Sequence, residues 1–221
     1  MRDKPDSCYE GCPLAETGRG FCLDSGDAAT AKMLVCCEAP GADEITFPLT
    51  KQEDTFWAAE IERRRAAYPD LPERLIKIGA PVVGRSGSLY WHWMMSPVGQ
   101  TRRDVFQMNV LRCKPPKHGD SNYPIGETRK QAERHCRQYD RHAAFAPDTA
   151  VVTIHPAALV RDITPLPLVV EDVRKARDLA KEGRRVMLLA GGKAAKAFTG
   201  GRENPTYWRG DIVAITGSLV E

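Results

Sequence analysis

The first strongly apolar stretch of the chain reads Ala31-Lys32-Met33-Leu34-Val35-Cys36-Cys37, and Pro40-Gly41 follows it. This stretch is short and has no helical periodicity, which is typical of a strand buried on both faces of a parallel sheet. A Pro-Gly pair is a strong signal for a loop after such a strand. We therefore predict that residues 31–37 form a buried parallel strand.

Strands and helices alternate along the rest of the chain. Similar apolar runs predict strands over residues 105–111, 150–154 and 185–190. Helices are predicted over residues 52–67, 127–144, 169–181 and 192–198. The alternation predicts an α/β fold with three layers, α/β/α, around a central, mainly parallel four-stranded sheet. Ligands of such sheets bind beyond the carboxyl ends of the strands, where Glu38, Asn109, His155 and Gly191 stand.

Length and composition set broad limits. The chain has 221 residues, of which 42% are hydrophobic and 28% charged, so we expect one domain over residues 1–221. No apolar run approaches the roughly 20 residues of a membrane-spanning helix, so no membrane partner is expected. Residues 1–10 are polar and lack the apolar segment of a signal peptide. A cytoplasmic location is the corresponding expectation.

Positive charge is concentrated in one segment, although the net charge is only +3. Residues 110–142 contain eight Lys and Arg against four Asp and Glu, with three His in addition. Such a patch is compatible with contacts to nucleic-acid phosphates. A solvated helix face is the alternative interpretation.

The chain contains seven cysteines, and an odd number cannot all pair. In a reducing compartment we expect no disulfide framework. The close pair Cys8 and Cys12 could join two distant cysteines, Cys113 and Cys136, to bind a [4Fe–4S] cluster or a zinc ion. Plain burial is the alternative for these four. Cys22, Cys36 and Cys37 are interpreted as core thiols.

Five landmarks together resemble one known family. They are Cys12-Pro13-Leu14; Cys37-Glu38-Ala39-Pro40-Gly41 with Glu44; Gly79-Ala80-Pro81-Val82-Val83-Gly84-Arg85-Ser86-Gly87; residues 109–116 with Cys136; and His155-Pro156-Ala157-Ala158-Leu159-Val160-Arg161. This set resembles the iron–sulfur uracil-DNA glycosylases, both the thermophile type and phage relatives. The likeness extends over residues 8–161.

The resemblance implies a role for each landmark. Cys8, Cys12, Cys113 and Cys136 would bind a [4Fe–4S] cluster. Glu38 or Glu44 would position or polarise the attacking water, and His155 would face uracil O2. Asn109 would read the flipped uracil, in a pocket formed with Ala39, Pro40, Gly41 and Val82. Contacts to DNA would come from Gly84, Arg85, Ser86, Ser88 and Arg161.

General chemistry agrees with these placements. An enzyme that acts on a base takes it out of the stack into a pocket. A carboxamide such as that of Asn109 can donate to uracil O4 and accept from N3–H. Cleavage of the glycosidic bond creates an oxocarbenium-like sugar and a uracil anion, which a carboxylate and a hydrogen-bond donor stabilise. Taken singly, Asn109 also fits a turn cap, Glu38 a loop carboxylate, and His155 a histidine satisfied within its loop.

The sequence departs from the family in three places. Three residues separate Cys8 from Cys12, where the family commonly has two. Val82 stands where the family has an aromatic residue that can stack on uracil; Tyr90, Trp91 or Trp93 could substitute. Residues 189–195 and Trp208-Arg209-Gly210 follow His155, whereas their counterparts precede the His-Pro loop in the family. Either these segments are permuted, or the usual loop lies beyond residue 221 of a longer chain.

Three functions follow in order of preference. The first is excision of uracil from DNA, in base excision repair or phage DNA replication. The alternative is a non-catalytic DNA-binding module of the same fold, associated with a replication protein or polymerase. The third is a zinc-stapled α/β protein of unrelated function.

Overall fold

A computed structural model describes residues 3–46, 54–117, 123–140, 142–199 and 210–215. Within them, a five-stranded sheet has the order β2-β1-β4-β3-β5. The strands are β1 (Met33–Cys37), β2 (Val105–Asn109), β3 (Thr149–Thr153), β4 (Val186–Ala190) and β5 (Ile212–Ala214). The first four are parallel and β5 runs antiparallel to β3. The mainly parallel sheet is confirmed, but the predicted strand number of four is wrong, because β5 adds an edge strand.

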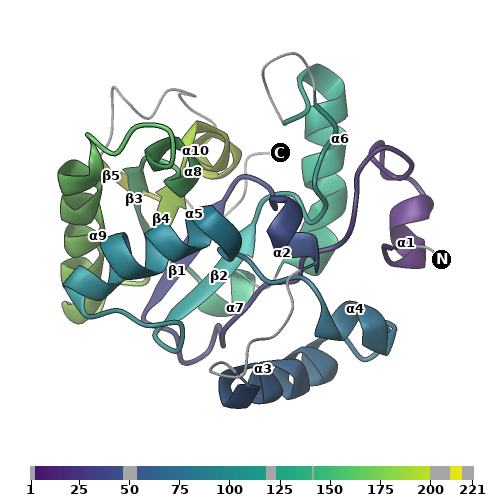
Figure 1. Cartoon of the computed structure of the whole chain (residues 1–221), viewed down its shortest axis with the longest axis horizontal. Coiled ribbons are helices and arrows are strands. Elements are labelled where there is room, and N and C mark those ends of the chain that lie inside the picture. Colours follow the sequence, from purple (N-terminus) through teal and green to yellow (C-terminus); the bar gives the residue numbers. More distant parts are fainter. Residues whose placement is uncertain (1–2, 47–53, 118–122, 141, 200–209, 216–221) are drawn as a thin grey trace.

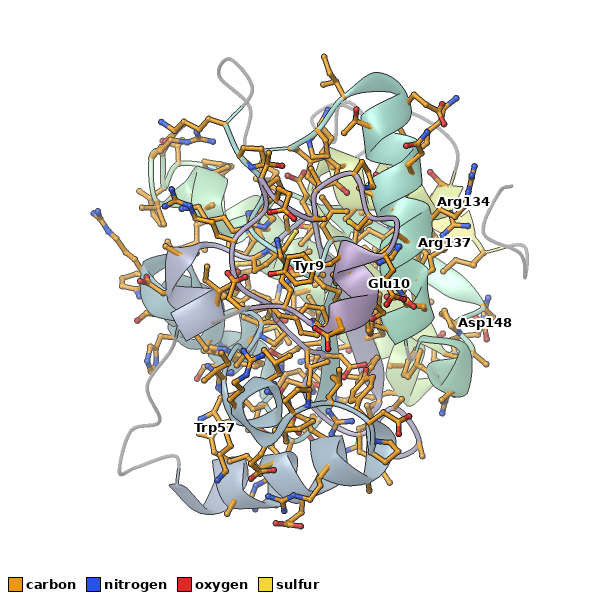
Figure 2. All side chains as sticks on the ribbon, turned by 90° about the vertical axis from the view of Figure 1, so that its right-hand side faces the viewer. Tyr9, Glu10, Trp57, Arg134, Arg137 and Asp148 are labelled. Carbon is orange, nitrogen blue, oxygen red and sulfur yellow. The ribbon has the colours of Figure 1, made fainter. Side chains whose placement is uncertain are left out.

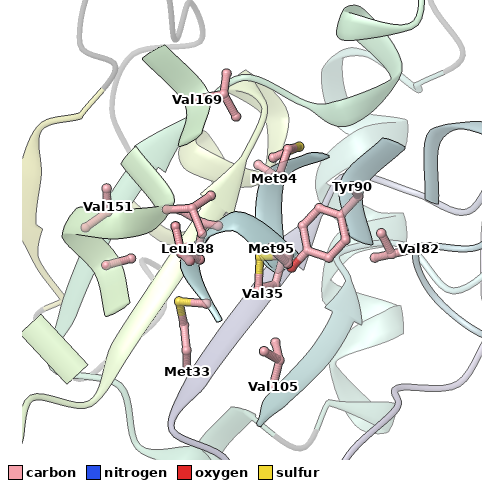
Figure 3. Packing of buried hydrophobic residues seen from close by; sticks show 14 of the residues in the cluster. Met33, Val35, Val82, Tyr90, Met94, Met95, Val105, Val151, Val169 and Leu188 are labelled. Carbon is pink, nitrogen blue, oxygen red and sulfur yellow. The ribbon is translucent and has the colours of Figure 1, made fainter. Parts of the chain in front are cut away.

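Every residue of the four parallel strands is buried, as expected for a sheet covered on both faces. Met33 and Val35 of β1 pack on one side, with the segment 90–98 and α9 (Leu166–Lys181). Leu34 and Cys36 pack on the other, with α7 (His142–Phe145) and α10 (Gly192–Thr199). The three-layer α/β/α architecture is therefore confirmed (Figure 1). Figure 3 shows the first of these two cores from close by.

Three predicted helices agree with the structure, namely α3 (Asp54–Ala67), α9 and α10. The helix predicted over 127–144 is wrong as a single element. It divides into α6 (Gly126–Cys136), the 3₁₀ turn η3 (Arg137–Tyr139) and α7. The division falls at Asp140, whose backbone is extended and whose carboxylate accepts a 2.7 Å hydrogen bond from the buried guanidinium of Arg112.

Several short helices had no clear periodicity in the sequence. They are α1 (Asp6–Tyr9), α2 (Ala42–Thr46), α4 (Glu73–Lys77), α5 (Gly84–Leu89), the 3₁₀ turn η2 (Ser96–Val98) and α8 (Pro156–Leu159). A π-helical segment, η1 (Tyr90–Met95), directly continues α5. π-Helical turns are rare and often accompany functional sites. Here α5 and η1 carry the chain from the loop at Val82 back across the sheet (Figure 1).

Some sequence predictions lie outside the described residues, among them Arg141 of the basic segment, Trp208 and Arg209. The described part of the chain contains no helix long and apolar enough to cross a membrane.

Candidate functional site

A cleft of about 740 Å³ opens beyond the carboxyl ends of β1, β3 and β4. Nine of the candidate residues named from the sequence line this one cleft: Glu38, Ala39, Pro40, Gly41, Glu44, Val82, Ser86, His155 and Arg161. Residues separated by more than a hundred positions are thus brought together by the parallel sheet. Asn109, Gly84, Arg85 and Ser88 do not line it.

Glu38 is a partly exposed carboxylate in the cleft lining. It directly follows β1, and its Oε1 accepts a 3.1 Å hydrogen bond from the backbone N–H of Lys193 at the start of α10. Backbone N–H groups at a helix start favour a negative charge. This arrangement holds the Glu38 carboxylate at the edge of the sheet.

His155 caps α8 from its N-terminal side. Its Nδ1 accepts a 3.1 Å hydrogen bond from the backbone N–H of Ala157. Burial lowers the pKa of His155 below its ordinary value, the charge of Glu38 opposes that shift, and Arg161 reinforces it. The imidazole is therefore neutral near pH 7, and because Nδ1 is an acceptor, we assign the proton to Nε2. A neutral N–H donor results at the cleft wall.

Glu44 differs from Glu38 in its surroundings, because it is almost fully buried. Its carboxylate accepts hydrogen bonds from the backbone N–H groups of Gly41, Val82 and Val83, with a distance of 2.5 Å from Gly41 N. Burial raises the pKa of Glu44 to about 7, and the three backbone donors limit the rise. The side chain is directed at the backbone of two loops, an arrangement that residue types alone did not indicate.

Asn109 ends β2, opposite Cys37 of β1, and is 1% exposed. Its Nδ2 lies 3.8 Å from Cys22 Sγ, and its buried Oδ1 has no hydrogen-bond partner among the described residues. The amide is thus sealed behind the cleft, next to the cleft-lining Cys37.

The aromatic residues offered as substitutes for Val82 are placed differently from one another. Tyr90 is fully buried, and Trp91 donates from Nε1 to the backbone carbonyl of Val82 at 3.0 Å. Trp93 is 60% exposed on η1, outside the cleft lining. Figure 3 shows Val82 beside Tyr90 at the edge of the core. The aromatic residue that does line the cleft is Tyr123, which sequence reasoning missed.

Cationic side chains stand at the cleft. Arg161 was expected there, whereas Lys114 and Lys193 were not singled out. Lys193 could have been found from its position two residues after the Gly191 that ends β4. Gly84, Arg85 and Ser88 lie on α5 next to cleft-lining Ser86.

The four candidate cluster cysteines are all buried and unpaired. Cys12, Cys113 and Cys136 share one small core cluster, and Cys8 of α1 lies beside it against Tyr139. Figure 1 shows α1 on the same side of the molecule as α6, and Figure 2 labels Tyr9 of α1 and the neighbouring Glu10. Burial raises the pKa of the Cys113 thiol to about 12, and the charges of Cys12 and Cys8 add to that rise. The four thiols are therefore close enough to interact electrostatically.

The surroundings of these cysteines suit an anionic group. The buried Lys4 ammonium donates to the carbonyls of Leu14, Ala15 and Gly18, and its charge lowers the pKa of Cys113. The backbone N–H of Arg112 lies 3.4 Å from Cys136 Sγ. In the described part of the chain, no group of three or more His, Cys, Asp or Glu is placed to hold a metal ion. A [4Fe–4S] cluster binds each thiolate to a different iron, so its ligands stand further apart than those of one ion.

No protein-family model matches the chain, and no curated protein matches it significantly.

Proposed function

We propose that the protein is a uracil-DNA glycosylase, which hydrolyses the N-glycosidic bond of a uracil flipped out of DNA. The observation that supports this most strongly is the gathering of Glu38, His155 and the loop 39–41 around one cleft at the carboxyl edge of the sheet. These residues follow two separate strands, β1 and β3, and they supply the carboxylate and the hydrogen-bond donor that the reaction needs.

The reaction requires stabilisation of two opposite charges. As the bond between C1′ and N1 breaks, the electron pair leaves with uracil and the sugar becomes positively charged. Ionised Glu38 would stabilise that sugar and accept a proton from the water that attacks C1′. Neutral His155 would donate from Nε2 to O2 of the departing uracil anion.

Base recognition would fall to Asn109. Its Oδ1 is a buried acceptor without a partner, which is costly unless a ligand supplies a donor. The N3–H of uracil is such a donor, and Nδ2 could donate to O4 in place of its weak contact with Cys22. Entry of the base would therefore require the wall at Cys37 to admit it to the amide.

Contacts to DNA would surround the cleft. Lys114, Arg161 and Lys193 provide positive charge for the phosphates. Ile163 follows the cleft-lining Asp162 and is 51% exposed. An exposed apolar side chain at this rim could occupy the space that the flipped base leaves in the duplex.

The cofactor in this proposal is a [4Fe–4S] cluster on Cys8, Cys12, Cys113 and Cys136. When bound, it would join the N-terminal segment, the loop after β2 and the end of α6 by covalent bonds. The thiols of the described cysteines are unpaired, which suits the reducing cytoplasm.

The test is excision from a labelled oligonucleotide containing one uracil, followed by alkali, which cleaves the chain at abasic sites. We expect scission with the native protein, and a loss of at least about 100-fold in Glu38→Ala and in Asn109→Ala. Glu171→Ala and Gln138→Ala serve as matched controls, because both residues are exposed and lie outside the cleft. Native excision rates in both site variants would contradict the assignment of the site.

The second candidate is a non-catalytic DNA-binding module of the same fold, associated with a replication protein or polymerase. It is favoured by the sealed position of Asn109 and by the aliphatic Val82 at the place of a stacking ring. Binding to the uracil oligonucleotide without any scission after alkali would support this candidate over the enzyme.

A further inference from the structure

Val82 has a left-handed backbone, with φ at +56°. Among the described non-glycine residues, Ala146 alone shares a positive φ. A β-branched residue in this region is an outlier, and such conformations persist only where the surroundings enforce them. Because Val82 lines the cleft, the groups that hold its backbone also shape the cleft wall.

The peptide groups of Val82 are held from both sides. The N–H donates to Glu44 Oε1, and the carbonyl accepts a 3.0 Å hydrogen bond from Trp91 Nε1. Arg102 Nη2 lies 3.4 Å from the same carbonyl oxygen. Close packing against Gly87 adds to this, since a Cβ atom there would lie 2.4 Å from the oxygen.

Glu44 joins this strained turn to the opposite wall of the cleft. Its Oε2 accepts a 2.5 Å hydrogen bond from the N–H of Gly41, which belongs to the loop after β1. The backbone carbonyl of Glu44 also accepts from the N–H of Ala80 at 2.9 Å. One buried carboxylate at the start of α2 thus connects the loop 38–41, which contains Glu38, with the loop 78–83.

We propose that Glu44 is a positioning residue, whose carboxylate locks the strained Val82 turn against the Gly41 loop and so sets the width of the cleft. This inference rests on the proposed glycosylase function. The inference gives the two carboxylates different roles. Glu38, partly exposed beside His155, acts on the reacting atoms, and Glu44 acts by holding the backbone of the two loops.

The first experiment compares Glu44→Gln with Glu60→Gln in single-turnover excision. Both residues are buried glutamates that accept a backbone N–H; Glu60 accepts from Gly26 and also from the side chains of Arg63 and Arg64, away from the cleft. A glutamine at position 44 places an amide donor against a backbone donor. We expect the excision rate of Glu44→Gln to fall at least tenfold and that of Glu60→Gln to match the native rate. A native rate in Glu44→Gln would overturn the inference.

A second substitution at Val82, made in the Glu44→Gln variant, tests whether Glu44 acts through the Val82 backbone or whether its loss simply damages the fold. Glycine adopts positive φ without strain. In Val82→Gly the turn therefore depends less on the hydrogen bond to Glu44 to keep its conformation. Val82→Ala removes similar apolar bulk while keeping an L side chain at that φ. In the Glu44→Gln background, we expect Val82→Gly to restore activity at least fivefold more than Val82→Ala. Equal activity of the two double variants would overturn the inference.

A readout without substrate keeps the two proposals separable. Hydrogen exchange of the amides in residues 39–45 and 80–90 should accelerate in Glu44→Gln and not in Glu60→Gln. Trp91→Phe, which removes the donor to the Val82 carbonyl and keeps a ring beside Tyr90, should accelerate exchange in 80–90 as well. Unchanged exchange in Glu44→Gln would overturn the lock itself. An inactive native protein with accelerated exchange in the variant would instead contradict the proposed function and support the lock.

Discussion

Glu38 and His155 approach each other at Gly191, where any side chain would displace the Glu38 carboxylate and press against His155. A Cβ atom on Gly191 would lie 2.5 Å from Glu38 Oε1 and 3.2 Å from His155 Cβ. The residue also has a φ of +99°, which L residues rarely adopt. The glycine that ends β4 therefore allows the carboxylate and the imidazole to occupy the same edge of the sheet.

Gly191→Ala should disrupt this pair more than it disrupts the fold. The added methyl displaces the Glu38 carboxylate, and a misplacement of about 1 Å can cost on the order of 100-fold in rate. The positive φ adds a stability cost on the order of 1–3 kcal/mol. Excision kinetics and urea unfolding check the two effects.

Gly183→Ala is the control, because Gly183 also has a positive φ and a Cβ atom there would meet no described atom within 4 Å. Equal excision rates in both variants would contradict the steric role of Gly191.

The residues at the carboxyl edge of the sheet could largely be predicted from the sequence, because parallel strands place their carboxyl ends together. Each of the apolar runs predicts a buried strand, and the residues that follow these runs are Glu38, His155 and Gly191. The role of Glu44 could not be predicted in the same way. Its partner Val82 is thirty-eight positions away, and the contact is with the Val82 backbone, which no residue type indicates. The break before α7 could not be predicted either, because it falls at Asp140, whose carboxylate accepts a hydrogen bond from Arg112, a residue beyond β2. Strand β5 has three residues, too few for a periodic pattern.

The cysteine assignment predicts different outcomes for two buried thiols. Cys136→Ser should yield protein without the broad absorbance at about 400 nm that [4Fe–4S] proteins show. Cys22→Ser should keep it, because Cys22 lies against Asn109 and outside the group of four. Iron and sulfide analysis of both variants checks the result. Loss of absorbance in Cys22→Ser with retention in Cys136→Ser would refute the ligand set, and stoichiometric zinc in the native protein would refute the cluster.

Ile163 should matter for duplex DNA and not for single strands. Flipping a base from a duplex requires unstacking that costs a few kcal/mol, and a wedge compensates part of it. We expect Ile163→Ala to reduce excision from a duplex about tenfold, equivalent to ~1.4 kcal/mol, and to leave a single-stranded substrate unaffected. Ile212→Ala is the matched control, since Ile212 is equally exposed, at 51%, and lies outside the cleft. An equal loss on both substrates would exclude the wedge role.

The burial of Glu44 predicts a specific pH dependence of stability. Its pKa is raised to about 7, above the ordinary value of about 4.3. Between these values, the folded chain holds a proton that the unfolded chain releases, so this group makes the free energy of unfolding fall as pH rises from about 4.3 to about 7. The effect should total about 4 kcal/mol and level off above pH 7. The side chain in Glu44→Gln cannot titrate, so urea unfolding between pH 4.5 and 8 should show a smaller fall of the free energy of unfolding in the variant.

Asp140, whose pKa burial raises to about 6, contributes equally to both proteins and cancels in the difference between their free energies of unfolding. Parallel pH profiles would mean that Glu44 titrates normally in the folded protein.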